Sequence, residues 1–207
     1  MKWWIASAVP ASLLGLGWLF SFGPSGAQWA SPAGWLVLLL LVVVAATDLS
    51  SRRIPNWATY TALAWGISAQ VVLVVTGGYP SGNRLGFPHP GEAVAGFFLG
   101  FTVFFLLYGI LGGGAGDVKL AAALGLFLGP AELFEVILIT CLAAGLVGAI
   151  VVTKSVLLPG PADMPHWRQR VKVALAGKLP MAPFFLVGLL AHWFSPSGGW
   201  LFPAGWK

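Results

Sequence analysis

Residues 33–47 read AGWLVLLLLVVVAAT, an apolar run without a charged side chain that ends directly before Asp48. A transmembrane helix needs about 20 mostly apolar residues, because each residue adds about 1.5 Å of rise and the hydrocarbon core is about 30 Å thick. With its uncharged flanking residues the run approaches this length. It therefore predicts a membrane-spanning helix that carries a carboxylate at its carboxyl end.

The composition of the whole chain agrees with a membrane protein. Of its 207 residues 58% are hydrophobic and 8% are charged, whereas soluble domains carry about 25% charged residues. Many of the eleven Trp residues lie near the ends of apolar runs, as in an aromatic belt. We assign the net charge of +5 to topology and to attraction for anionic lipids, not to nucleic-acid binding. The single cysteine, Cys141, excludes an internal disulfide and a CxxC metal site.

Seven apolar runs are candidate membrane spans. They cover residues 3–22, 33–47, 57–76, 92–111, 118–128, 131–153 and 180–194. The fifth run is short and only Gly129-Pro130 separates it from the sixth, so the two could also form one broken helix. The first run could be a signal peptide, but its length and the interruption by Pro10 favour a retained helix. We predict an all-α polytopic membrane helix bundle that forms a single domain over residues 1–207.

The positions of Lys and Arg predict how the chain is threaded. With the N-terminus in the cytoplasm and seven crossings, nine of the eleven basic residues fall on the cytoplasmic side, and Arg84 and Lys207 fall outside. Cytoplasmic loops of membrane proteins carry an excess of Lys and Arg, so the count supports this orientation. In this topology Asp48 and Asp117 both reach the cytoplasmic face.

Two of the six acidic residues stand apart from the others. Four have explanations in helix starts, where carboxylates are favourable, or in a polar loop: Glu92, Glu132, Glu135 and Asp163. Asp48 ends an apolar run, where the helix dipole disfavours a carboxylate. Asp117 follows the glycine-rich residues 112–116 and could serve as a helix N-cap. Ionisable groups near membrane depth are costly, so these two aspartates are the candidates for a functional role.

Two carboxylates at one depth indicate a specific chemistry. If they meet, they would share one proton, because two like charges cannot both remain ionised in close contact. One carboxylate could then act as general base on a water and the other as acid toward a carbonyl, with no metal, cofactor or nucleophilic side chain. The glycines before Asp117 would let an extended peptide backbone approach closely.

Other chemistries have little support in the sequence. The predicted positions of His89, His166 and His192 are outside, inside and outside, so these side chains cannot easily converge on a metal or in a catalytic triad. The chain also lacks HExxH, GxSxG and Walker motifs.

Three segments resemble bacterial type IV prepilin peptidases. Residues 48–56, DLSSRRIPN, resemble the aspartate, spacer and Ile-Pro-Asn segment of that family. Residues 114–120, GAGDVKL, resemble its GxGD segment, and residues 178–184, KLPMAPF, are similar to its late proline-containing helix start. The three occur in the family's order, and the first two lie on one face of the predicted membrane topology.

The resemblance implies an intramembrane aspartic endopeptidase in the bacterial inner membrane. It would remove the short basic leader from pilin-like precursors at the cytoplasmic face, with Asp48 and Asp117 as the catalytic pair. The other motif residues are expected to bind substrate or to shape the site: Gly114, Gly116, Lys119, Pro55 and Asn56. Lys119 either stabilises a nearby carboxylate or is a flanking cytoplasmic charge, and Pro55 and Asn56 are expected to shape the turn into the third span.

The chain also departs from the family pattern. Larger members carry an insert with paired CxxC motifs and methylate the new pilin end, so a chain with one cysteine is expected to cleave without methylating. The first run is additional to the expected six-helix core, and the loop at residues 154–179 has no counterpart in the motif pattern. Two other functions stay open: a proton-coupled transporter that uses the aspartates as a relay, and a non-catalytic assembly subunit.

Overall fold

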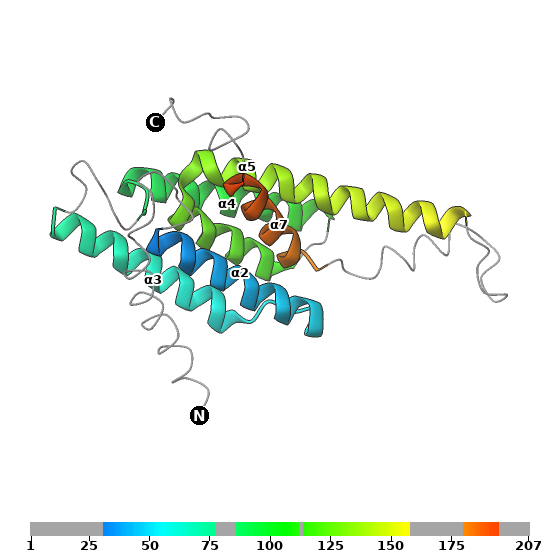
Figure 1. Ribbon diagram of the computed structural model, residues 1–207, viewed down its shortest axis with the longest axis horizontal. Coiled ribbons are helices and arrows are strands. Elements are labelled where there is room, and N and C mark those ends of the chain that lie inside the picture. The colour runs from blue at the N-terminus through cyan, green and yellow to red at the C-terminus, as the bar shows by residue number, and fades with distance from the viewer. Residues whose placement is uncertain (1–30, 78–85, 112–113, 158–179, 195–207) are drawn as a thin grey trace.

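The computed structural model describes residues 31–77, 86–111, 114–157 and 180–194, and these ranges contain helices and no strand (Figure 1). The helices are α2 (Pro32–Ser51), α3 (Asn56–Val75), α4 (Pro90–Leu111), α5 (Ala115–Leu157) and α7 (Ala182–Trp193). Four of them, α2 to α5, are long and apolar enough to cross a membrane. The all-α membrane class is therefore confirmed, whereas the predicted first span and most of the loop at 154–179 lie outside the described residues.

Helix α2 is longer than the sequence indicated. The Ser31 side chain accepts a hydrogen bond from the Gly34 N–H at 3.1 Å, and Pro32 occupies the first turn, where its missing N–H costs nothing. The helix ends at Ser51, four residues beyond the predicted run, and Arg52 closes it in the left-handed region with φ 50°. Asp48 therefore lies within the last turn of α2 and not beyond its end.

Helix α5 reverses direction at Gly129, which has φ 74° and ψ 177° and precedes Pro130. A β-carbon built on Gly100 of α4 would contact both Ala121, before the break, and Leu133, after it. In a straight helix these two residues would be about 18 Å apart along the axis. The two arms of α5 therefore lie side by side, which matches the two predicted runs at 118–128 and 131–153.

The first arm of α5 is the centre of the bundle. It packs against α4 and α3, and its leucines and alanines from Leu120 to Leu128 are almost wholly inaccessible. Contact with α4 is close because small residues meet there: a β-carbon on Gly125 would overlap the carbonyl oxygen of Gly96, and one on Gly100 would overlap that of Ala121. Such small-residue interfaces let two membrane helices approach to backbone contact. This contact holds the arm that begins with the GxGD segment.

We expect Gly125→Ala to destabilise the bundle. Overpacking a close interface costs about 1–3 kcal/mol and occasionally more, and here the obstructing atoms belong to the backbone of Gly96 and cannot rotate away. Unfolding of the purified protein in mild detergent should show a lowered midpoint. Gly109→Ala is the matched control on α4, because a β-carbon there would meet nothing within 4 Å. Equal midpoints for the two variants would contradict the close crossing.

Candidate active site

The carboxylate of Asp48 is buried between the last turn of α2 and the first turn of α7. Its side chain is 6% exposed, and its Oδ2 atom accepts a hydrogen bond from the backbone N–H of Ala182 at 3.1 Å. The carboxyl end of α2 disfavours a negative charge, whereas the first N–H groups of α7 favour one. The start of α7 thus supplies the stabilisation that α2 alone does not give to Asp48.

Asp117 stands in the first turn of α5 and not at the N-cap that the sequence suggested. Gly114 flanks the helix, and Asp117 Oδ2 reaches back to accept its N–H at 3.1 Å. This is the carboxylate half of a capping box. Glu92 repeats the arrangement at the start of α4, where its Oε2 accepts the N–H of His89 at 3.2 Å. Asp117 is partly exposed, so its carboxylate can also meet groups from outside the helix.

The turn that follows Asp48 packs on the turn that carries Asp117. A β-carbon on Gly116 would come within 2.9 Å of the β-carbon of Ile54. Ile54 thus packs directly against the backbone of Gly116, and the role of Gly116 in binding substrate or shaping the site stays a prediction. Pro55 adopts an extended conformation directly before α3, and its carbonyl accepts the N–H of Ala58 at 3.0 Å.

Lys119 links the same two segments. Its ammonium donates to Asn56 Oδ1 at 3.1 Å and to the Tyr60 hydroxyl at 3.0 Å, and it lies 4.8 Å from the centroid of the Tyr60 ring. Its hydrogen bonds thus go to α3 and not to a carboxylate. Tyr60 was not singled out from the sequence, although its place four residues after Asn56 puts both on one face of α3.

These contacts gather three distant segments at one end of the bundle. Figure 1 shows the end of α2 and the starts of α3, α5 and α7 on the same side. Asp48 contacts the start of α7, and the residues after it contact the segment that holds Asp117. The predicted aspartates therefore belong to one region of the fold, built from all three sequence segments.

A second pair of ionisable groups is buried elsewhere. His192 Nδ1 and Glu135 Oε2 are 2.9 Å apart, and each side chain is 2% exposed. The sequence accounted for Glu135 by its place at a helix start, and the structure adds a contact with His192 that the sequence analysis did not predict. The signal was available, because the predicted topology puts the start of the sixth run and the end of the seventh on the same side.

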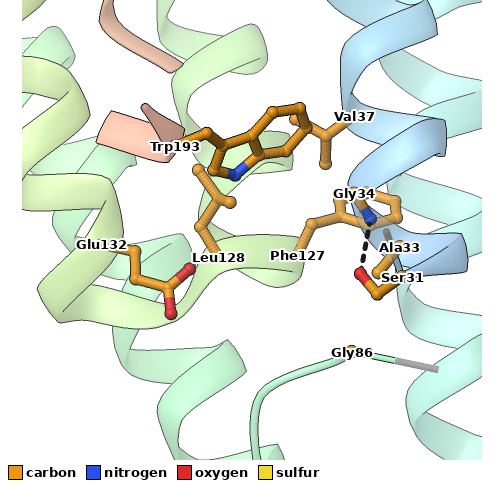
Figure 2. Close-up of a pocket in the computed structure, with 9 residues that line it drawn as sticks. All are labelled: Ser31, Ala33, Gly34, Val37, Gly86, Phe127, Leu128, Glu132 and Trp193. Atoms are coloured by element: carbon orange, nitrogen blue, oxygen red, sulfur yellow. Dashed lines mark hydrogen bonds between the residues drawn. The ribbon is translucent and has the colours of Figure 1, made fainter. Parts of the chain in front are cut away.

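The pocket drawn in Figure 2 is remote from the aspartates. It lies where α2 begins, and Trp193, Leu128 and Glu132 line it together with Ser31 and neighbouring residues. Asp48 is at the opposite end of α2. The pocket is therefore no part of the candidate active site.

We expect Lys119→Met to loosen the contact between the two motif segments. Each hydrogen bond contributes about 0.5–1.5 kcal/mol, and the loss should be at the low end because Asn56 and Tyr60 are exposed. Limited proteolysis at the turn of residues 52–55, where Arg52 and Arg53 are exposed, should become faster. Lys154→Met, which removes an exposed cation at the far end of α5, is the control. Equal cleavage rates for both variants would show that the Lys119 bonds do not hold the turn.

Comparison with known proteins adds an independent observation. Residues 35–149, which include Asp48 and Asp117, match the model described as the type IV leader peptidase family. Two curated relatives are named prepilin leader peptidase/N-methyltransferase, from Burkholderia pseudomallei strains 1026b and K96243. Each is 30% identical over 191 residues, an alignment that covers 87% of this chain and 51% of the relative. The chain thus spans about half the length of these relatives, and no solved structure gave a significant match.

Proposed function

The chain belongs to the type IV leader peptidase family, and from this we propose that it is an aspartic endopeptidase that removes the leader from pilin-like precursors. One observation carries the proposal: the turn after Asp48 packs directly on the turn that holds Asp117. This packing brings the two carboxylates of the family's motifs to one end of the bundle. Their shared location is what a general acid and a general base acting on one peptide bond require.

The proposed reaction is hydrolysis by a pair of carboxyl groups. One carboxylate takes a proton from a water while that water attacks the scissile carbonyl carbon, and the other carboxyl group protonates the carbonyl oxygen. The tetrahedral intermediate collapses with cleavage of the C–N bond: the amine leaves with the proton that the base had accepted, and one hydroxyl group returns its proton to the other carboxylate. Each aspartate is held by a backbone N–H at a helix start, so both are positioned before substrate binds.

The proposed substrate class follows from the family, and the charges around the site set a condition on how that substrate is attracted. We propose that the leader is short and basic, that it approaches from the cytoplasmic side of a bacterial inner membrane, and that it is followed by an apolar helix. Arg52 and Arg53 are exposed beside Asp48 and would repel a basic leader. The aspartates and anionic lipids therefore have to supply the local attraction.

We also propose that the chain cleaves without methylating the product. The curated relatives carry a methyltransferase in their names and are about twice as long as the aligned region. The 207 residues of this chain contain one cysteine and so cannot provide paired CxxC motifs, which the resemblance associates with the methylating members.

The test uses the purified chain in vesicles of phosphatidylethanolamine and phosphatidylglycerol. A pilin-like precursor encoded near its gene is added with and without S-adenosylmethionine, and the products are followed by gel mobility and mass spectrometry. The proposal expects a truncated pilin whose new N-terminus has the unmethylated mass in both reactions. An uncut precursor would contradict the peptidase assignment, and a methylated product would contradict the absence of transferase activity.

A further inference from the structure

Neither Glu135 nor His192 reacts in the proposed hydrolysis. The two side chains join the second arm of α5 to the last turn of α7 at 2.9 Å, and each is 2% exposed. Burying ionisable groups is costly even when they are paired, and apolar residues of similar size would often be as stable. The best-attested use of such a pair is to fix the register of two elements.

Helix α7 is short, and a buried polar pair of this kind would fix its register relative to α5. It has 12 residues and packs against α5 and α2 through apolar side chains such as Phe185 and Leu189, which are fully buried. Apolar contacts have no preferred direction, so they set the position of a helix along its axis less strictly than a hydrogen bond does. Besides the contact of α7 with Asp48, the polar links between α7 and α5 include the pair of His192 with Glu135 and the hydrogen bond from Thr140 to the Phe184 carbonyl at 3.2 Å.

A shift of α7 along its axis moves both of its ends, because the helix moves as one unit. His192 is ten residues, or about 15 Å of helix rise, from Ala182, whose N–H binds Asp48 at 3.1 Å. A slide of α7 by one residue would move that N–H by about 1.5 Å, beyond hydrogen-bond distance. The carboxylate of Asp48 would then lose both its donor and its orientation.

We propose that Glu135 and His192 are positioning residues for Asp48, because they fix the register of α7 and hence the place of its first N–H group. This inference rests on the proposed catalytic role of Asp48. The two side chains would thus influence the reaction from the opposite end of α7, although neither contacts the substrate.

The central variant is the double substitution Glu135→Leu with His192→Leu. It replaces the pair by two apolar side chains, so packing and stability in the membrane are kept while the directional bond is removed. His192→Leu alone leaves a carboxylate buried without its histidine partner and is expected to be the less stable protein. Glu92→Gln, which changes an exposed carboxylate at the start of α4, is the control.

The readouts are kcat and KM for precursor cleavage, together with hydrogen exchange of the first turn of α7. For the double variant we expect kcat to fall about tenfold or more, KM to stay within about twofold, and exchange at Ala182 to accelerate while α4 keeps its wild-type protection. A loss of global stability would instead accelerate exchange throughout the bundle, and that outcome would overturn the proposal.

The failure of this inference differs from failure of the proposed function. If Asp48→Asn is inactive but the double variant has wild-type kcat and wild-type exchange at Ala182, the pair does not position Asp48 and the peptidase assignment stands. If wild-type protein does not cleave precursors, the assignment fails, and unchanged exchange at Ala182 in the double variant would separately refute the register role.

Discussion

Asp48→Asn is expected to abolish leader removal, with a rate about 10²–10⁴-fold below wild type, which is the usual contribution of a general acid or base. The substitution is nearly isosteric, and the asparagine Oδ1 atom can still accept the N–H of Ala182 that Asp48 binds. The local structure should therefore be retained, whereas an amide cannot take up the proton of the attacking water. Precursor cleavage in vesicles measures the loss, and thermal unfolding in detergent checks that the fold is intact.

Asp48→Ala separates catalysis from structure. It should be as inactive as Asp48→Asn, but it also leaves the buried N–H of Ala182 without an acceptor, which costs about 1–3 kcal/mol. An alanine variant that unfolds earlier than the asparagine variant, with both inactive, fits a catalytic carboxylate that also binds α7. Processing that continues in the asparagine variant would favour a transporter or an assembly subunit.

Much of the fold could be predicted because a helix that crosses a lipid bilayer must be long and apolar enough to span it. Helices α3 and α4 begin and end within two residues of their predicted runs, and α5 turns at the predicted Gly129-Pro130. Where α2 ends was predicted less well, because Ser50 and Ser51 look like loop residues. In the structure their hydroxyls donate to the Thr47 carbonyl within the last turn of the helix.

Only part of the candidate site could be predicted from the sequence. Asp48 could be singled out because its own helix gives no reason for a carboxylate there. Its partner could not, because the donor is a backbone N–H that every residue but proline has, 134 positions away. The pairing of Glu135 with His192 was missed for a different reason: the predicted topology put both on one side, but a carboxylate near a helix start already has an adequate local explanation.

Asp117→Asn is the second substitution with a large expected effect, again about 10²–10⁴-fold in rate. Because Asp117 accepts the N–H of Gly114 at the start of α5, a purely structural role as a helix cap has to be excluded. Asparagine Oδ1 can accept the same N–H, so stability should change little. Glu92→Gln is the matched control, since Glu92 accepts the N–H of His89 at the start of α4 with the same spacing.

The double variant of Asp48→Asn with Asp117→Asn decides whether the aspartates act as one unit. If the two aspartates contribute independently, the rate losses of the single variants multiply in the double variant. If they act as one unit, the first substitution already removes nearly all of the rate enhancement that the pair provides. If the residual cleavage is measurable, the double variant should therefore be about as active as the weaker single variant. A product of the two single losses would mean that each carboxylate supports cleavage on its own, and hydrolysis by a pair that shares one proton would then be wrong.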